Sequence, residues 1–510
     1  MRLARCRSVT LVGVRGTVVD IEVHIGGMPG FTLVGLPDTS LYEARDRVRA
    51  AVLSSREPWP LQKITASLSP AAIPKRGSHF DLGVAVAVLA AAEEVPTLAT
   101  DGVVFFGELA LDGRLRAVPG VLPAVVAAVR AGLTRVVVPE ANAEEARLVP
   151  GVHVLGARSL RQVLAFLRGA DIPEEDPDDL AVATLDSSVD STLDLADVVG
   201  QVRARTAVEI AAAGHHHLML SGPPGSGKTM LARRLPGLLP DLTMAASLEV
   251  SAIHSVAGVL RGDQPLIVRP PFADPHHTAS QVAVVGGGSR IIRPGLASLA
   301  HRGVLFLDEA PEFSPRVLDA LRQPLEHGEI VVSRAEATTV FPARFLMVVA
   351  QNPCSCGNFG VRNRVCECRP HAVHRYRQRL SGPVRDRIDL QVDVEAPTMA
   401  DIDAGLAAAE SSTTVAERVA QARHRQARRL APTPWRTNGE LPGSYLRREL
   451  RLPADATVPV YDELRRGRLT VRGADRVLRV AWTIADLAGR ERPTRADVGF
   501  ALGLRLGSTA

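Results

Sequence analysis

Three short apolar runs in the middle of the chain have the pattern of buried parallel strands. They are residues 217–221, 303–307 and 345–350, and each is bounded by glycine, proline or polar residues. Strand, loop and helix patterns follow one another across residues 195–397. This order predicts an α/β core built on a parallel sheet.

The regions on either side of this core have different patterns. Residues 1–168 alternate β-like runs with helical runs rich in Ala, Val and Leu, which predicts a mixed α/β domain. Residues 169–194 are rich in Asp, Glu, Pro, Ser and Thr, as expected of an acidic, solvated linker. Residues 398–510 are rich in Arg and Ala and have helical spacing, which predicts a helical C-terminal lid domain. The β-like runs of the first domain are 10–14, 17–23, 103–106 and 135–139.

The length of 510 residues and the composition agree with about three globular domains. The formal net charge is +5, although residues 171–197 contain ten acidic residues and no Lys or Arg. Such mild basicity favours nucleic acid only weakly. The longest apolar run, 82–92, is shorter than the ~20 residues of a membrane-spanning helix. No secretory signal is visible, so we expect a cytoplasmic protein without a membrane partner.

Residues 222–229 match the phosphate-binding pattern G-x-x-x-x-G-K-[ST], between an apolar strand and a helical run. The glycines allow the backbone to wrap phosphates, and the following helix start favours anions. We expect Lys228 at the β- and γ-phosphates and Thr229 at a Mg²⁺ ion, so ATP and Mg²⁺ are the predicted cofactors. The predicted nucleotide-binding residues of this loop are Gly222, Pro223, Pro224, Gly225, Ser226, Gly227, Lys228 and Thr229.

Polar residues at the ends of the other two strands complete the predicted site. Asp308 and Glu309 follow the second apolar run, and Asn352 follows the third. We expect Asp308 to contribute to the Mg²⁺ site and Glu309 to polarise the attacking water. A glutamate at this point favours ATP hydrolysis over nucleotide storage. Asn352 can orient the water near the γ-phosphate.

Six further motifs are specific when taken together. They are Asp-Pro-His-His-Thr-Ala-Ser at 274–280, Val-Gly-Gly-Gly at 285–288, Arg-Pro-Gly at 293–295, Leu-Arg-Gln-Pro-Leu-Glu at 321–326, Asn-Pro-Cys-Ser-Cys-Gly at 352–357 and Leu-Ser-Gly-Pro-Val-Arg-Asp-Arg-Ile-Asp at 380–389. On these motifs the chain resembles the YifB/ComM family of magnesium-chelatase-like AAA+ ATPases over essentially its whole length. It departs from the family where Ala273 and Asp274 occupy the neighbourhood of a usual arginine, and where Ser355 replaces a proline.

The resemblance implies an ATP-driven ring, a hexamer, that acts on DNA as a helicase or in branch migration, in recombination or natural transformation. It also implies that Arg387 is an arginine finger for the neighbouring subunit, with Arg385 the weaker candidate. Arg472 resembles the lid arginine that senses nucleotide state, with Arg476 as a substitute. The alternative is a magnesium-chelatase-like motor or protein remodeller that acts on a partner protein.

Two segments of the core are expected to face the ring's channel, again from the resemblance. Residues 329–341 alternate as a hairpin does, with Arg334 near its tip, and residues 282–293 contain a glycine-rich basic loop. Arg290, Arg293 and Arg334 could then follow phosphates without reading sequence. A second basic stretch, 418–429, is predicted to form a solvated lid helix more readily than a DNA contact.

The first domain resembles the proteolytic domain of Lon protease in residues 74–82 and 107–116. In this alignment the nucleophile position falls on His79 and the lysine position near Pro123, and no lysine lies between Lys75 and Lys228. A serine–lysine peptidase needs both groups. We therefore expect a domain without peptidase activity that docks a protein partner or regulates the motor.

Four of the five cysteines form two Cys-x-Cys pairs, separated by nine residues. Four thiolates can surround Zn²⁺ tetrahedrally, although Cys-x-Cys is tighter than the usual spacing. A structural zinc ion, reduced free thiols and disulfides all remain open at this point. The cysteines concerned are Cys354, Cys356, Cys366 and Cys368.

Overall fold

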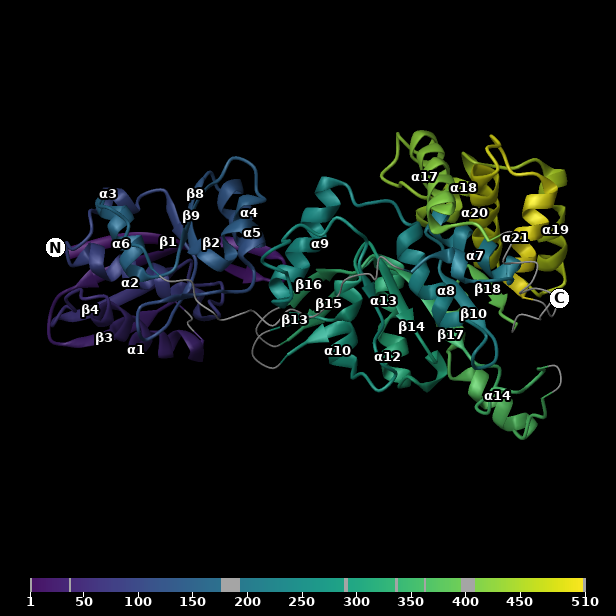
Figure 1. Cartoon of the computed structure of the whole chain (residues 1–510), viewed down its shortest axis with the longest axis horizontal. Helices are drawn as coiled ribbons and strands as arrows, with labels where there is room; N and C mark the ends of the chain where they lie inside the picture. The colour runs from purple at the N-terminus through teal and green to yellow at the C-terminus, as the bar shows by residue number, and fades with distance from the viewer. Residues whose placement is uncertain are drawn as a thin grey trace.

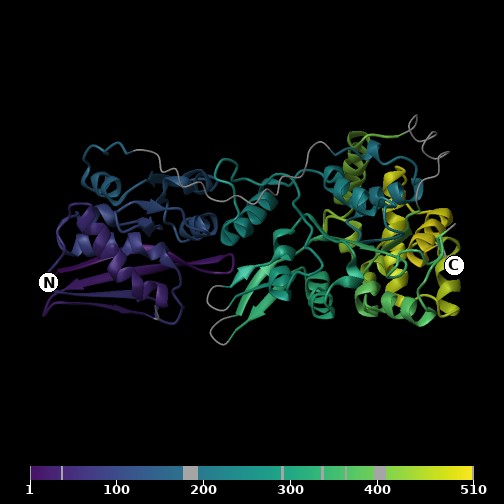
Figure 2. The same cartoon turned by 60° about the horizontal axis from the view of Figure 1, so that its bottom comes forward.

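The structure is a computed structural model that describes residues 2–35, 38–175, 193–288, 292–334, 338–361, 364–395 and 409–507. The molecule is elongated, with the N-terminal α/β region at one end, the nucleotide-binding core in the middle and the C-terminal helices at the other end (Figure 1). A view turned by 60° shows the same succession (Figure 2). Within these ranges, no helix combines the length and apolar character that crossing a bilayer requires.

The N-terminal region is built on a mixed seven-stranded sheet in the order β3-β4-β2-β1-β5-β8-β9. The first two predicted strands are longer than expected, because they pair over their whole length as one antiparallel hairpin. Helix α2 (Asp81–Ala91) is buried throughout, so it forms the centre of this core. The strands are β1 (Arg2–Val12), β2 (Arg15–Ile25), β3 (Gly30–Val34), β4 (Lys63–Ser69), β5 (Val103–Phe105), β8 (Arg135–Pro139) and β9 (His153–Ala157). The other helices of more than five residues are α1 (Thr39–Ser54), α4 (Val121–Arg130) and α6 (Leu160–Arg168).

The central sheet has five parallel strands in the order β11-β14-β17-β10-β18. The three strands expected from the sequence are β10 (Leu218–Ser221), β14 (Val304–Leu307) and β17 (Leu346–Gln351), and they occupy the middle of the sheet. The edge strands β11 (Phe272–Ala273) and β18 (Leu390–Asp393) were not predicted. The expected fold class, a mixed α/β chain with a parallel sheet and a helical C-terminal region, is confirmed.

The C-terminal helices pack on helix α7 (Val202–Gly214) of the core through α17 and α20. The predicted lid helix forms as α17, but it is less solvated than expected, because four of its five arginines are half-buried and have partners within the molecule, and only Arg428 is exposed. Arg418 pairs with Glu209, and Arg429 pairs with buried Asp486. The helices are α17 (Ser412–Arg429), α18 (Gly443–Arg448), α19 (Ala454–Arg465), α20 (Val471–Leu487) and α21 (Arg495–Leu506).

Helix α9 (Met244–Ala257) of the core forms the contact with the N-terminal region. Its Leu248 and Ala252 pack against the N-terminal core beneath α4. At its end, the hydroxyl of Ser255 donates to the buried carboxylate of Glu145, and the Ser255 carbonyl accepts from the Gly120 amide at 3.0 Å. Burial raises the pKa of Glu145, while its hydrogen-bond donors oppose that rise. The two regions therefore share one core at this helix.

A second contact joins the two regions at a pair of hairpins. Strands β15 (Glu329–Ser333) and β16 (Thr338–Pro342) form the hairpin expected from the sequence. The turn between β1 and β2 lies against it, because Gly13 sits so close to Thr339 and Val340 that a Cβ atom there would be 2.9 Å from each. Gly13 has φ +63°, so this turn needs glycine for its conformation as well as for space.

Candidate active site

The loop between β10 and α8 (Lys228–Arg234) lies at the carboxyl edge of the central sheet. Gly225 and Gly227 have φ values of +77° and +90°, which favour glycine. A Cβ atom on Gly222 would lie 2.1 Å from the carbonyl oxygen of Val394. The loop therefore needs its glycines to turn tightly beside β18, and its backbone is left close to any bound phosphate.

Lys228 is held at the centre of this loop. Its ammonium group donates to the carbonyls of Gly222 and Pro223 at 2.7 and 2.8 Å and to Oδ1 of Asn352 at 3.1 Å. Burial lowers the pKa of Lys228, and the carboxylates of Asp308 and Glu309 oppose that effect. Phosphate oxygens can replace the carbonyl and amide oxygens that Lys228 contacts, so the site fits a nucleoside triphosphate.

Thr229 and Asp308 meet at the place expected for Mg²⁺. The Thr229 hydroxyl donates to Oδ2 of Asp308 at 2.8 Å, although the two residues come from α8 and from the end of β14. A hydroxyl and a carboxylate are oxygen ligands of the kind that Mg²⁺ takes beside nucleotide phosphates. These two residues would hold the ion, whose charge would stabilise the phosphates of ATP.

Glu309 follows Asp308 in the chain, but its side chain is directed toward His277. Its backbone has φ +49°, and its amide donates to Oδ1 of Asp308 at 2.9 Å. Its side chain is half exposed, and Oε2 lies 3.6 Å from Nδ1 of His277. The carboxylate is thus accessible to water, as a general base requires, and near enough to Lys228 to help keep its pKa up.

Two residues at this edge were missed by the sequence analysis. Gln201, which precedes α7, donates from its amide to the carbonyl of Ser226 at 2.5 Å and so supports the phosphate-binding loop. His277 lies in a motif that was recognised, but its contact with Glu309 was not predicted. Neither contact is visible in the sequence, because the partners are 25 and 32 residues apart in different loops.

Arg387 and Arg472 lie at the opposite, amino edge of the same sheet. They line one cavity of about 680 Å³ together with His217, Phe345 and Asp389, which immediately precede β10, β17 and β18. A four-residue strand is about 13 Å long at ~3.3 Å per residue. Neither arginine is therefore placed at the phosphate-binding loop of its own chain.

The arginines of this cavity differ in their partners. Arg476 is bound to buried Asp389 at 2.6 Å. Burial alone would raise the pKa of Asp389, but Arg476 and the adjacent histidines hold it well below its usual value. Arg387 pairs with Glu326, and Arg472 is exposed at the start of α20. Arg472 is thus freer than Arg476 to contact an incoming anion.

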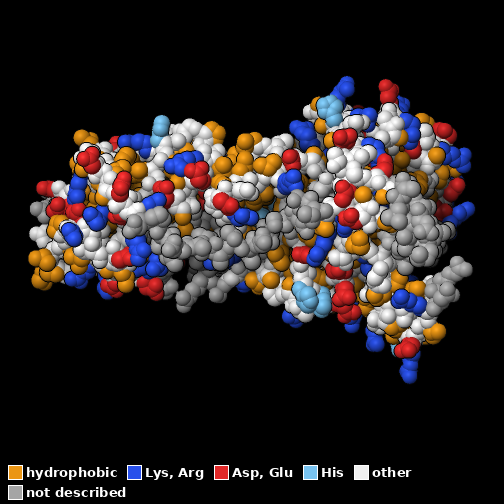
Figure 3. Space-filling view, viewed as in Figure 1, with side chains coloured by type: hydrophobic (Ala, Val, Ile, Leu, Met, Phe, Trp, Pro, Cys, Tyr) orange, Lys and Arg blue, Asp and Glu red, His pale blue; other side chains and the backbone are white. Residues whose placement is uncertain are grey.

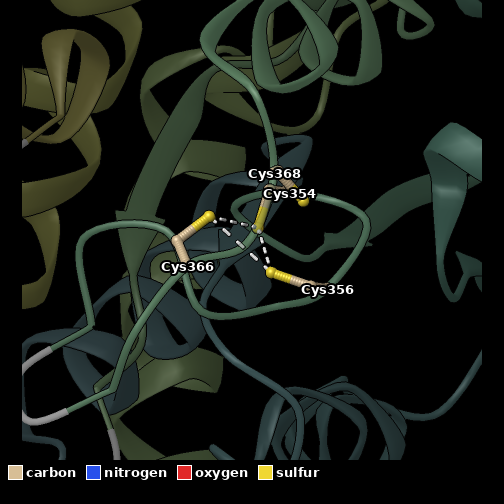
Figure 4. Close-up of side chains that lie close together, drawn as sticks. All are labelled: Cys354, Cys356, Cys366 and Cys368. Carbon is tan, nitrogen blue, oxygen red and sulfur yellow. Dashed lines mark hydrogen bonds between the residues drawn. The ribbon is translucent and has the colours of Figure 1, made fainter.

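The four clustered cysteines are brought together by the structure. Their sulfur atoms all lie within 4.8 Å of one another, between the end of β17 and the start of α14 (Pro370–Gln378). The Sγ atoms of Cys354, Cys356 and Cys366 point toward a common centre, with Cys368 beside them (Figure 4). This cluster could hold a metal ion.

The N-terminal region uses its polar residues in internal contacts. The Ser78 hydroxyl donates to Glu108, and the ammonium of buried Lys75 donates to the Pro70 carbonyl. His79, at the aligned nucleophile position, is buried with Nε2 at 3.0 Å from the Val9 carbonyl, and burial lowers its pKa to about 4. These contacts are structural and give no support to peptidase chemistry.

The outer surface shows no separate basic face in the orientation of Figure 1. Blue Lys and Arg side chains and red Asp and Glu side chains are interspersed along the molecule (Figure 3).

Three family models match successive parts of the chain. Residues 194–402 match the family model described as magnesium chelatase, subunit ChlI, and residues 19–142 match that of subunit ChlI of Mg-chelatase. Residues 409–505 match the model of the ChlI C-terminal region.

Similar proteins cover almost the entire chain. An uncharacterized protein of Mycobacterium tuberculosis is 51% identical, and the alignment covers 99% of both chains. Protein YifB of Escherichia coli is 42% identical over 99% of this chain and 97% of its own length. The competence protein ComM of Haemophilus influenzae is 41% identical over 99% of this chain and 98% of its own length. The chain therefore belongs to the YifB/ComM family of magnesium-chelatase-like AAA+ ATPases.

Proposed function

We propose that this protein is an ATP-hydrolysing ring motor that acts on DNA in the cytoplasm. The carrying observation is that the candidate arginines and the phosphate-binding loop lie at opposite edges of one sheet. One chain then holds only part of a hydrolytic site at each edge. We expect a closed ring, a hexamer. In such a ring the phosphate-binding edge of each chain faces the arginine-bearing edge of the next chain, so every site is complete.

In this mechanism the residues of one chain bind ATP and prepare the water. Lys228 exchanges its carbonyl partners for phosphate oxygens. Thr229 and Asp308 would hold a Mg²⁺ ion, whose charge would offset that of the phosphates. Glu309 accepts a proton from the attacking water, and Asn352, which already contacts Lys228, orients that water at the γ-phosphate.

The neighbouring chain supplies positive charge. Arg387 exchanges Glu326 for the γ-phosphate oxygens, because a guanidinium fits charge that spreads over several oxygens. Arg472 approaches the same phosphates from the lid helix α20. Arg385, on α15 (Gly382–Asp386), is exposed on the same segment and serves as a comparison residue.

Support for DNA as the substrate comes from the segments expected to face the channel. The side chain of Arg334, at the end of β15, lies beside Gly287 of the glycine-rich loop, so the two segments are neighbours. Arg293 on β13 (Arg293–Pro294) is exposed beside that loop. Arg290 lies outside the described residues. The competence protein among the relatives is consistent with a DNA-related role.

The first test is ATP hydrolysis with and without single-stranded and branched DNA at several salt concentrations. We expect stimulation that weakens as salt rises, because phosphate contacts release counterions. An Arg334→Ala variant should need more DNA for half-maximal stimulation. For this variant, the slope of log affinity against log salt concentration should be smaller in magnitude by about 0.7 for each phosphate contact that is lost.

Arg465→Ala is the matched control, since Arg465 is 81% exposed at the end of lid helix α19. It should behave like the unaltered chain. ATP hydrolysis that ignores DNA at every salt concentration would contradict the proposed substrate. Stimulation by a folded or unfolded protein instead would favour a chelatase-like motor or a remodeller of partner proteins.

We also propose that the cysteine cluster binds one Zn²⁺ ion. A tetrahedral site with Zn–S distances of about 2.3 Å requires S–S distances of about 3.8 Å. The Sγ atom of Cys366 lies 3.7 Å from those of Cys354 and Cys356, which are 3.3 Å from each other. These separations are too long for the ~2.05 Å bond of a disulfide. Gly357, within the loop, packs on Pro224, so the ion would stiffen one wall of the nucleotide site.

We expect about one zinc ion per chain in the purified protein, measured by elemental analysis. A Cys366→Ser, Cys368→Ser double variant should lose the metal, and Co²⁺ loaded in its place should fail to give thiolate-to-metal absorption. Cys6→Ala is the control, because Cys6 is buried in the N-terminal core. Metal-free wild-type protein with four reactive thiols in this loop would contradict the assignment.

A further inference from the structure

The segment that contains the four clustered cysteines and helix α14 is strongly basic. Residues 354–379 contain six arginines and one glutamate, so their formal net charge of +5 equals that of the whole chain. This imbalance is local, because acidic and basic side chains are interspersed along the molecule in Figure 3. The segment protrudes from the core and lies away from β13, β15 and β16 (Figure 1). It is therefore a basic feature separate from the segments expected to face the channel.

Two arginines of this segment attach it to the core. Arg377 donates to the carbonyl of Pro353 at 3.1 Å. Arg379 pairs with Glu312 at 2.8 Å, on the short helix η5 (Ala310–Glu312) that α14 contacts. The charges of these two arginines are thus used within the molecule, and their contacts fix the position of α14.

Three other arginines of the segment are exposed and have no partner. The side chains of Arg364, Arg369 and Arg375 form no hydrogen bond or ion pair with any residue that the structure describes. We call these three residues the free arginines. Like charges held in one short segment repel one another, and a bound anion would remove that repulsion. The free arginines are therefore available to an anionic ligand.

The start of α14 adds a feature that also favours an anion. Arg369 is the N-cap residue of this nine-residue helix, and no side chain caps the first turn. The N–H groups at a helix N-terminus attract negative charge, so a phosphate there would meet them together with the Arg369 guanidinium. Arg375 lies six residues further on, which is ~9 Å along the helix axis at ~1.5 Å per residue. Such a separation suits successive phosphates of a polynucleotide better than one isolated phosphate.

We propose that the free arginines form a second contact for the phosphate backbone of DNA, outside the channel. Contacts of this kind position DNA without reading its sequence, and they weaken as salt rises. The segment also adjoins the nucleotide site, because Gly357 packs on Pro224 of the phosphate-binding loop. DNA bound here would therefore lie beside the edge at which ATP is hydrolysed. This inference rests on the proposed function, since it takes DNA as the substrate, and it deepens that function.

The test combines Arg364→Ala, Arg369→Ala and Arg375→Ala in the full-length chain. Binding of a fluorescently labelled oligothymidylate is measured with a non-hydrolysable ATP analogue over a series of salt concentrations. At about 0.1 M salt we expect affinity to fall about tenfold or more. The slope of log affinity against log salt concentration should be smaller in magnitude by about 2, at about 0.7 for each phosphate contact. Lysine at the same three positions should restore most of the affinity and of the slope, because it keeps the charge.

The matched control removes three other exposed arginines, all in the C-terminal region, through Arg428→Ala, Arg448→Ala and Arg451→Ala. Its affinity for DNA should equal that of wild type. Equal weakening in the control and the test variant would overturn the proposal, because net charge alone would then explain the loss. Wild-type affinity in the test variant, with weaker binding by Arg334→Ala, would also overturn it and leave DNA as the substrate of the channel.

Two further outcomes separate this inference from the proposed function. Wild-type protein that binds no DNA at any salt concentration would remove both. A test variant that binds DNA weakly only because it no longer assembles would overturn the inference in favour of a contact with a neighbouring chain, and its mass in solution measures this. Thermal unfolding and the reactivity of the four clustered thiols, matched to wild type, exclude misfolding as the cause of a loss.

Discussion

Replacing Glu309 with glutamine is expected to lower ATP turnover by about 100-fold or more, since removal of a general base costs 10²–10⁴ in rate. The amide is nearly the same size, and Lys228, Thr229 and Asp308 keep their contacts with one another. ATP binding should therefore persist. Single-turnover hydrolysis and binding of a fluorescent ATP analogue measure the two steps separately.

Glu491→Gln provides the control for the loss of one carboxylate, because Glu491 is exposed in the turn between α20 and α21. Its turnover should equal that of wild type. A Glu309→Gln chain that hydrolyses ATP at the normal rate would show that another group activates the water. A chain that no longer binds ATP would show instead that Glu309 supports the structure of the site.

Replacing Arg387 with alanine is expected to lower turnover by 10³-fold or more, at the scale seen when an arginine finger is removed. Arg387 lies at the amino edge of the sheet and is paired with Glu326, away from the phosphate-binding loop of its own chain. The defect should therefore appear in assembled rings, with ATP affinity of the dissociated chain unchanged. Turnover measured across a range of protein concentrations tests this dependence on assembly.

Mixing two inactive variants gives a sharper test of the shared site. In rings formed from equal amounts of Arg387→Ala and Glu309→Gln chains, about one interface in four combines an intact Glu309 with an intact Arg387, since adjacent copies form each site. Turnover should recover to about that fraction of wild type. Arg385→Ala changes the exposed position two residues earlier. Chains with this change should gain no turnover from mixing with Glu309→Gln chains beyond the turnover that they have themselves. No recovery in the first mixture would mean that both residues act within one chain.

The strands in the centre of the fold could be predicted because β10, β14 and β17 are continuous apolar runs with clear boundaries. The edge strands were missed for a physical reason. Strand β11 contains only Phe272 and Ala273, and β18 alternates apolar residues with Gln391 and Asp393. Both are defined by pairing with a neighbour, which the sequence does not record.

The candidate site likewise contains contacts that the sequence predicts and contacts that it does not. Lys228 and Thr229 lie in one loop whose conformation is set by its own sequence, so the motif predicts the contacts that they make. The position of Arg387 at the far edge depends on strand order, and the contact of His277 with Glu309 depends on how two loops meet. Such contacts arise from tertiary packing, which is why a recognised histidine motif gave no chemistry.

The packing of α9 has a consequence for where this chain can be divided. The acidic composition around residues 169–194 suggests a place to separate the N-terminal region from the motor. A fragment beginning at residue 195, however, would expose Leu248 and Ala252 to water and leave Ser255 without the Glu145 carboxylate. Exposed apolar patches of this kind promote aggregation. The smallest unit that keeps α9 covered therefore includes both regions, even though only one of them contains the phosphate-binding loop.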